Sequence, residues 1–286
     1  MAITPNYPMV NLGNLYIQGG RLTYVTTTTF TVGIGQFRDS TNINDIVIPT
    51  TTTVSLAVSG LNGLDTGTLA ASTIYYVYAI GSSVYGANNG LDAGAPQGVG
   101  PTPGVTTTVP AGTTPNSYVP AGVIISATNG TPTLPFGYDM FRRIGAIRTT
   151  SGSLIEPFIQ RGLGKNRLMR YMTPVSTTAT AGTVTYATIG ALLAIVPQIQ
   201  CDVIIACTLT AATAGNSLYL GPYGNTAAGY CARFSAPIVS AAVAYIQLVS
   251  PCALNAAATP VVEVDYFTTA AGDVVAFAIS GYVDAL

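Results

Sequence analysis

The sequence predicts an all-β protein with an extended N-terminal arm, a β-sandwich or barrel-like domain, and a C-terminal jelly-roll-like β-sandwich. Segments rich in Thr, Val, Ile and Tyr recur along the 286 residues, and these residue types favour strands. Clusters of Gly, Asn and Asp separate them at the short intervals typical of sandwiches and barrels. Helical patterns are rare: residues 190–195 suit one helical turn before Pro197, and 141–147 is too short and too rich in Ile and Gly for a helix.

The N-terminal part divides into an arm and a first β domain. Residues 1–20 carry Pro5 and Pro8 and form the predicted arm. Residues 21–165 form the first domain, interrupted by a Gly-, Pro- and Thr-rich insertion over 88–120 that is too long for an ordinary loop. Strands are expected over 24–32, 46–58, 73–80 and 122–127. We expect Tyr75, Tyr76 and Tyr78 to pack along a strand rather than to bind a ligand.

The second β domain spans residues 166–286, a length that suits a jelly roll. Its expected strands cover 183–189, 201–209, 217–220, 241–249, 261–267 and 274–279. All four cysteines lie here, widely spaced and without a C-x-x-C motif: Cys201, Cys207, Cys231 and Cys252. This spacing argues against a metal site and favours buried thiols, and it leaves a disulfide open.

Composition excludes several classes of function. Charged residues make up 7% of the chain, against about 25% in a typical soluble domain, and the formal net charge is −1. The chain has no His, which excludes a Ser-His-Asp nucleophile, an imidazole base and a His zinc site. We therefore expect no enzyme activity, no catalytic, cofactor-binding or metal-binding residue, and no cofactor. Near-zero net charge instead favours association with other subunits.

Membranes and nucleic acid are not expected partners. The N-terminus lacks the basic and apolar regions of a signal peptide, and no run of about 20 apolar residues occurs. The overall balance of charge also argues against a nucleic-acid-binding protein.

One segment concentrates positive charge. Seven of the ten basic residues fall between 142 and 170, opposed there only by Glu156: Arg142, Arg143, Arg148, Arg161, Lys165, Arg167 and Arg170. We treat these seven as a candidate interface for an acidic neighbouring subunit, since Arg tolerates burial in interfaces. A solvated linker and a nucleic-acid contact are the alternatives.

The carboxylates show no catalytic pattern. Asp39, Asp45, Asp65 and Asp92 stand beside Gly, Asn or Ser, where Asp commonly forms turns. A glycosidase needs only two carboxylates, but the sequence brings no pair of them together. Asn129-Gly130 is likewise expected to be a turn.

Three segments resemble virion structural proteins of tailed bacteriophages. The first is RLTYVTTTTFTVGIGQFRDSTNIND over residues 21–45, where a Thr-rich strand leads into a Gly-x-Gly-x-x-Arg-Asp-Ser-Thr-Asn turn. The others are GLDTGTLAASTIYYVYAIG at 63–81 and YDMFRRIGAIRTTSGSLIEPF at 138–158. Arg38, Asp39, Ser40, Thr41 and Asn42 match this signature, and we expect them to form a hydrogen-bonded turn with an internal ion pair.

The resemblance implies a structural role rather than catalysis. It implies a homotrimer on the particle exterior, assembled in the host cytoplasm, with the major capsid protein or other virion proteins as partners. A capsid decoration (cement) or head-fibre subunit is favoured, because the repeats of long fibres are missing. A tail fibre or receptor-binding protein that recognises host surface glycan is the alternative, and a polysaccharide-degrading tailspike is a third.

Overall fold

The protein is all-β in a computed structural model. The structure describes residues 16–82, 121–162, 164–176, 180–183, 185, 187–189, 192–199, 201–213, 215–222, 232–235, 243–251, 253–254 and 262–286. Most of the predicted arm and the whole 88–120 insertion lie outside these residues, as do Asp92, Cys231 and Cys252. No helix in the described ranges is long and apolar enough to cross a membrane.

The N-terminal lobe has three groups of strands around a main apolar core and a smaller apolar cluster. A small sheet has the order β1-β4-β5, a second has the order β10-β8-β9-β7, and β2, β3 and β6 belong to a larger sheet described below. The bounds are β1 Ile17–Gly19, β2 Leu22–Tyr24, β3 Thr29–Val32, β4 Gly35–Arg38, β5 Asp45–Ile48, β6 Thr52–Ser55, β7 Gly63–Leu64, β8 Ile74–Gly81, β9 Gly122–Ser126 and β10 Met140–Arg148.

Alternation of side chains explains most of these strands. In β3, Phe30 and Val32 are buried and alternate with the half-buried Thr29 and Thr31, as the two-residue period of a strand requires. Strand β8 differs because it is buried along its whole length. Its two faces pack into separate clusters, so Tyr75 contributes to the main core and Tyr76 and Tyr78 to a smaller one. The tyrosines therefore pack along a strand, as the sequence predicts.

Three expected elements differ from the structure. The sequence predicts one strand over 46–58, but β5 ends at Ile48 and β6 covers Thr52–Ser55 in another sheet. It also predicts one strand over 24–32, but β2 ends at Tyr24 and β3 begins only at Thr29. The hydroxyl of Thr26 accepts the backbone N–H groups of Thr28 and Thr29, and this local bonding forms a hairpin turn instead. The sequence disfavours a helix over residues 141–147 and predicts no strand there, but these residues lie within β10.

The C-terminal lobe is a jelly roll. One sheet has the order β18-β15-β21-β12 and the other β14-β20-β16-β17, so that the chain alternates between two facing sheets. The bounds are β12 Asn166–Ser176, β14 Ala187–Thr188, β15 Cys201–Thr210, β16 Ser217–Pro222, β17 Ala232–Ser235, β18 Val243–Pro251, β20 Val262–Thr268 and β21 Val274–Ala285; β13 (Thr180–Ala181) and β19 (Ala253–Leu254) are short additions. The expected sandwich fold is confirmed, and the single helical turn appears as a 3₁₀ turn over Leu192–Ala194.

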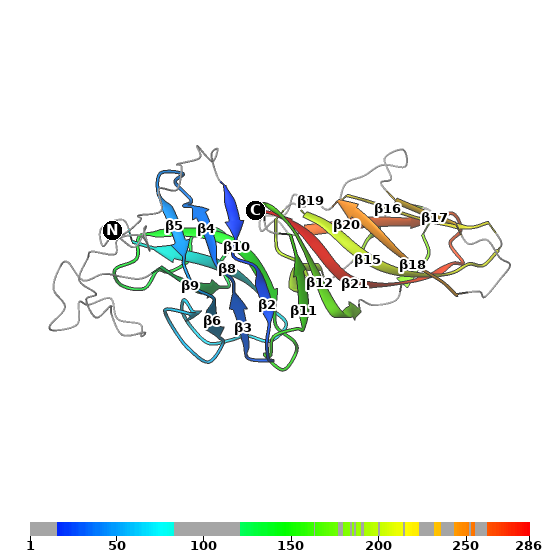
Figure 1. The fold of residues 1–286 in the computed structure, drawn as a ribbon. Coiled ribbons are helices and arrows are strands. Elements are labelled where there is room, and N and C mark those ends of the chain that lie inside the picture. Colours follow the sequence, from blue (N-terminus) through cyan, green and yellow to red (C-terminus); the bar gives the residue numbers. More distant parts are fainter. Residues whose placement is uncertain are drawn as a thin grey trace.

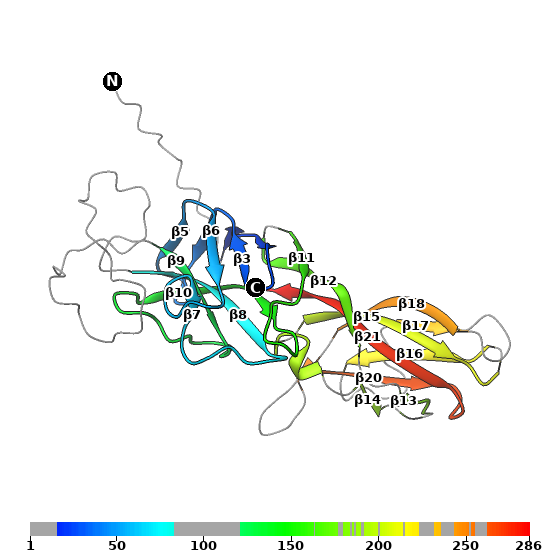
Figure 2. The same cartoon turned by 90° about the horizontal axis from the view of Figure 1, so that it is seen from below.

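The two lobes lie end to end and share one sheet (Figures 1 and 2). Strand β11 (Phe158–Arg161) pairs with β2 of the first lobe and with β12 of the second. The shared sheet therefore runs in the order β18-β15-β21-β12-β11-β2-β3-β6. One apolar core continues under it from Phe30 to Val203, so the sheet and the core both span the junction.

Candidate functional site

The predicted interface residues gather where the lobes meet. Arg142, Arg143 and Arg148 lie on β10, and Arg161, Lys165, Arg167 and Arg170 lie on the β11–β12 hairpin. The structure divides them into three groups: arginines bonded inside the chain, basic residues on an open sheet face, and one arginine in a pocket.

Arg167 is the most deeply buried of the seven, with 0% of its surface exposed. Its Nε donates to the carbonyl oxygen of Gly164 at 3.0 Å, and its two terminal nitrogens donate to those of Gly20 at 2.8 Å, Ile144 at 3.1 Å and Gly19 at 2.5 Å. Burial lowers the pKa of Arg167 to about 10, and the charge of Asp284 acts in the opposite direction. The guanidinium therefore stays charged at neutral pH and joins β12 to both β10 and the β1–β2 connection.

Two further arginines form ion pairs inside the chain. Arg143 pairs with the buried Asp284 of β21, with Nη2 to Oδ1 at 3.0 Å and Nη1 to Oδ2 at 3.1 Å. Arg148 pairs with Glu156 at 2.9 Å and also donates to the carbonyl oxygen of Ala194. The bonds to Asp284 and to Ala194 connect β10 with distant residues of the second lobe, so they hold the lobes together.

Burial raises the pKa of Asp284, while the adjacent Arg143 and the nearby Arg167 lower it. Tyrosine hydroxyls add to the same junction: Tyr282 donates to the carbonyl oxygen of Ala146, and Tyr171 donates to that of Ile195. Much of the basic segment thus serves the folding of this chain.

The remaining basic residues lie on the open face of the shared sheet. Register places Thr23 beside Ile159 and Ile159 beside Arg170, and all three side chains are exposed. Arg21 immediately precedes β2 and Arg161 ends β11, and both side chains are exposed beside the position where the two strands pair.

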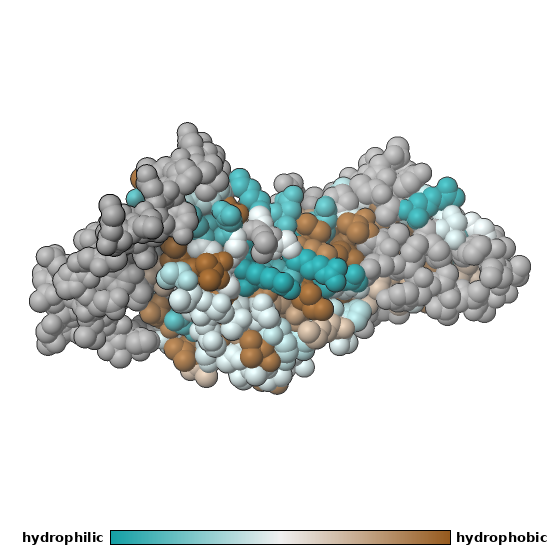
Figure 3. Space-filling model, in the orientation of Figure 1, coloured by the Kyte–Doolittle hydropathy of each residue, from teal (hydrophilic) through white to brown (hydrophobic). Residues whose placement is uncertain are grey.

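We call this surface the cationic face and define it by Arg21, Arg161, Lys165 and Arg170. Exposed apolar side chains accompany it: Ile159 is 44% exposed and Met172 is 55% exposed. In Figure 3 a hydrophilic band crosses the middle of the molecule over this region, with hydrophobic side chains on both sides. Sequence analysis did not include Arg21, although it alternates with the buried Leu22 and so belongs to the outward set.

The sign of the exposed charge differs from that of the whole chain. All ten basic residues and ten of the eleven acidic residues are described, the exception being Asp92. Five basic residues are exposed, namely those of the cationic face and Arg233, whereas only Asp139 and Asp202 are exposed acids. The described surface is therefore positive while the chain carries a formal charge of −1.

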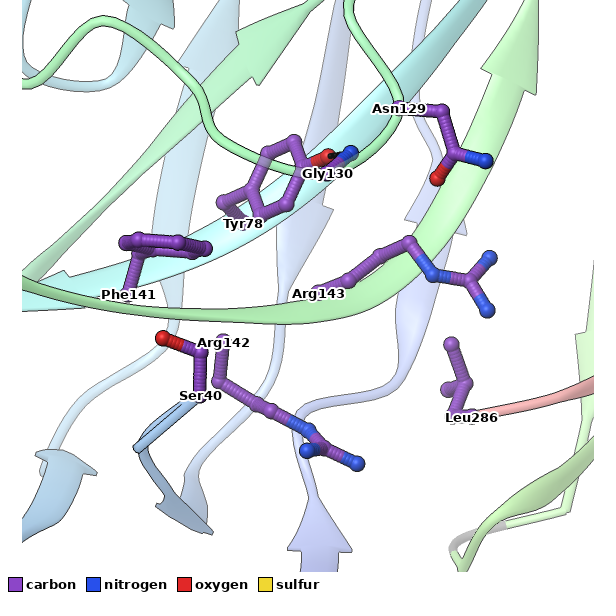
Figure 4. Close-up of a pocket in the computed structure, with 8 residues that line it drawn as sticks. All are labelled: Ser40, Tyr78, Asn129, Gly130, Phe141, Arg142, Arg143 and Leu286. Carbon is purple, nitrogen blue, oxygen red and sulfur yellow. Dashed lines mark hydrogen bonds between the residues drawn. The ribbon is translucent and has the colours of Figure 1, made fainter. Parts of the chain in front are cut away.

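A pocket of about 200 Å³ opens beside β10, the edge strand of its sheet. Its lining includes Ser40, Tyr78, Asn129, Phe141, Arg142 and Arg143 (Figure 4). The rings of Tyr78 and Phe141 meet edge to face with centroids 5.9 Å apart. Figure 4 shows Arg142 and Arg143 leaving the strand in different directions, with Leu286 between their guanidinium ends.

The Arg-Asp-Ser-Thr-Asn signature forms the expected turn. The carboxylate of Asp39 accepts the backbone N–H of Ile43 at 2.8 Å and of Asn44 at 3.1 Å, and the hydroxyl of Thr41 at 2.7 Å. Burial alone would raise the pKa of Asp39, but these hydrogen bonds outweigh it and lower the pKa.

Arg38 pairs with Asp45 at 3.2 Å, so the hydrogen-bonded turn is present, but its ion pair joins the signature to β5 rather than lying within the five residues. Asp45 itself begins β5 rather than a turn, which corrects its expected role. Pairing across the strand ends explains its place, because Arg38 is its direct partner in the register.

The other predicted polar positions are structural. Asp65 accepts the backbone N–H groups of Thr66 and Thr133. Cys201 and Cys207 are buried and form no disulfide. Within the described ranges, no group of three or more His, Cys, Asp or Glu side chains is arranged to hold a metal ion.

Comparison with known proteins does not assign this chain to a family. No family model matches the chain, and no curated protein matches it. Among solved structures, the VP2 subviral particle of infectious bursal disease virus is 14% identical with a TM-score of 0.18, over 97% of this chain and 73% of that chain. The Gx strain of the same virus gives 12% identity and a TM-score of 0.18, over 95% and 66% of the two chains. Values this low establish neither a shared fold nor a shared function.

Proposed function

We propose that this chain is a non-enzymatic structural protein of a virion exterior, a homo-oligomeric capsid decoration or head-fibre subunit that attaches through its cationic face. Two sources support the class of protein. The three segments quoted above resemble tailed-bacteriophage virion proteins, and the jelly roll of the C-terminal lobe is an architecture used by viral capsid domains.

The cationic face carries the proposal that the chain docks onto an acidic neighbour. Arg21 and Arg161 are exposed on neighbouring parts of β2 and β11, and neither guanidinium forms a hydrogen bond or ion pair with a described residue. An acidic partner would neutralise these charges and would cover the exposed Ile159 and Met172. The outer surface of this chain offers few carboxylates to fill that role.

Attachment through this face leaves the jelly roll projecting from the particle. The shared sheet fixes the C-terminal lobe to the attachment face, because β11 belongs to the sheet of both lobes.

We propose a trimer as the assembled unit. Sedimentation of the purified full chain tests this, and a monomer at micromolar concentration would overturn it.

The deciding experiment measures the chain in particles purified from cells that encode it. Quantitative mass spectrometry of wild-type particles should find it at a fixed copy number, and its absence would overturn the virion role. The double variant R21E/R161E should be depleted at least tenfold, because reversing two charges turns attraction to an acidic surface into repulsion. Normal incorporation of this variant would overturn attachment through the cationic face.

Arg233 supplies the matched control. It is also an exposed arginine, but it lies on β17 in the second sheet of the jelly roll. The variant R233E should enter particles at the normal copy number. Raised salt should strip the wild-type chain from particles, since salt screens contacts between exposed charges.

A receptor-binding protein for host glycan is the second candidate, because jelly rolls also form lectin domains and a pocket lies beside β10. Binding of the full chain to host cells, abolished by removing their surface polysaccharide, would favour it. A tailspike enzyme would instead shorten that polysaccharide during incubation.

A further inference from the structure

We propose that the pocket beside β10 binds a small ligand that carries a carboxylate on a polar ring, of the size and chemistry of a uronic acid. Nothing in the proposed structural role requires such a site. The inference stands on the pocket alone and holds or fails independently of attachment to particles.

The first observation is that the side chain of Arg142 has no partner among the described residues. It is half-buried, yet its guanidinium forms no hydrogen bond or ion pair with any described residue, and its Nε is buried without a partner. The other buried or half-buried arginines on β10 and β12 all have acceptors, as described for Arg143, Arg148 and Arg167. A guanidinium nitrogen that loses water without gaining an acceptor destabilises the fold, so the buried Nε of Arg142 marks a candidate for ligand binding.

The surrounding charges point to an anion. Burial lowers the pKa of Arg142, and the positive charge of the adjacent Arg143 lowers it further, with only Asp39 acting in the opposite direction. Arg143 is already neutralised by Asp284, whereas the Asp39 carboxylate is occupied by its own turn. Among the side chains that line the pocket, the guanidinium of Arg142 is therefore the charged group without a partner, and a carboxylate matches the planar guanidinium in two parallel hydrogen bonds.

The rest of the lining suits a polar ring. The half-buried ring of Phe141 supplies aromatic surface beside β10, with the buried Tyr78 packed against it (Figure 4), and ligand sites commonly combine such surface with a few polar groups. The amide oxygen of Asn129 and the hydroxyl of Ser40 have no hydrogen-bond partner in the described part of the chain, so they can bond ligand hydroxyls.

Size limits the ligand to a small molecule. A volume of about 200 Å³ lies below the range of roughly 300–1,000 Å³ found for drug-sized ligands. A single acidic sugar, free or at the end of a chain, is of the appropriate size. Because the pocket follows the edge of β10, a terminal residue can enter while the rest of a chain stays in solvent.

The experiment is titration of the full chain with sodium glucuronate, followed by calorimetry or ligand-observed NMR, with glucose and inorganic phosphate in parallel. Glucuronate should bind saturably and glucose at least tenfold more weakly. Equal binding of glucose, or no saturation with glucuronate, would overturn the proposal. Binding of phosphate but not glucuronate would also overturn it, because it would leave an anion contact without sugar recognition.

The variant R142Q tests the residue. It should bind glucuronate at least tenfold more weakly and should unfold at an unchanged or higher urea concentration, since it removes a charge that has no partner. Retained binding would overturn the assignment of Arg142. R161Q, an exposed arginine on the cationic face, should bind as the wild type does. N129A gives a second variant outside the strand and should also weaken binding.

Discussion

Replacing Arg167 should destabilise the whole molecule, because its guanidinium bonds four carbonyl oxygens at the junction of the lobes. The variant R167M keeps a side chain of similar length but leaves the oxygens of Gly19, Gly20 and Ile144 buried without this donor. A hydrogen bond to a charged group contributes about 1.5–3 kcal/mol. The desolvation of the charge offsets part of the sum, so we expect a loss of about 3–5 kcal/mol, as when a buried ionic network is broken.

Urea unfolding of the full chain measures this loss. Tyrosine fluorescence is the appropriate signal, because the chain has 17 Tyr and no Trp. Wild type should unfold in a single transition, since one core continues through both lobes. R161M, six residues away and exposed, is the control and should stay within about 0.5 kcal/mol of wild type. If R167M changed stability by less than about 1 kcal/mol, the account of the junction would be refuted.

Three other predictions concern single groups. D39A should lower the free energy of unfolding by about 1–3 kcal/mol, because it leaves N–H groups of the turn without an acceptor. The difference from wild type should vanish in acid, since the lowered pKa of Asp39 stabilises the fold only above that pKa. S40A is the control, and an equal loss in both variants would contradict this reasoning. R143M should remove the partner of Asp284, so the pKa of this buried carboxyl should rise further. Because protonation of Asp284 then favours the folded state, the stability of R143M in urea should increase as pH falls from neutral. A flat pH profile would contradict this prediction. Cys207, with a pKa raised to about 12 by burial, should resist iodoacetamide in the native protein and react after unfolding, as peptide mass spectrometry would detect.

Much of the fold follows from residue pattern alone. The β-branched and aromatic runs mark β8, β9, β15, β20 and β21 because these strands are buried and regular. The hairpin within 24–32 escaped prediction because Thr favours strands on average, whereas its hydroxyl can also accept backbone N–H groups. The composition of the segment does not show whether it forms one continuous strand or a turn held by threonine hydroxyls.

The basic segment shows a different limit. The sequence shows that positive charge is concentrated there. It does not directly show which of these side chains point into the protein and which point outward. A signal was available in β12, where Arg167 has the same strand parity as the buried Met169 and Tyr171, and Arg170 has the opposite parity. The acceptors of Arg167 could not be predicted, since Gly19 and Gly20 are almost 150 residues away in the chain.

The pocket was not predictable for a related reason. It combines a turn near residue 40, the bend at Asn129 and the edge of β10, which no local pattern connects. A backbone hydrogen bond from the N–H of Ser40 to the carbonyl oxygen of Phe141 joins the turn to the strand.

The sheet shared by the lobes has a mechanical consequence. Cross-strand partners continue without interruption from Thr53 through Thr31, Thr23, Ile159, Arg170, Gly281 and Ile204 to Val249. A load applied to the far end of the jelly roll therefore passes into the first lobe through paired strands, which narrow to the Thr23–Ile159 pair between β2 and β11, and through the common apolar core. The two lobes should therefore tilt together rather than bend at a flexible tether.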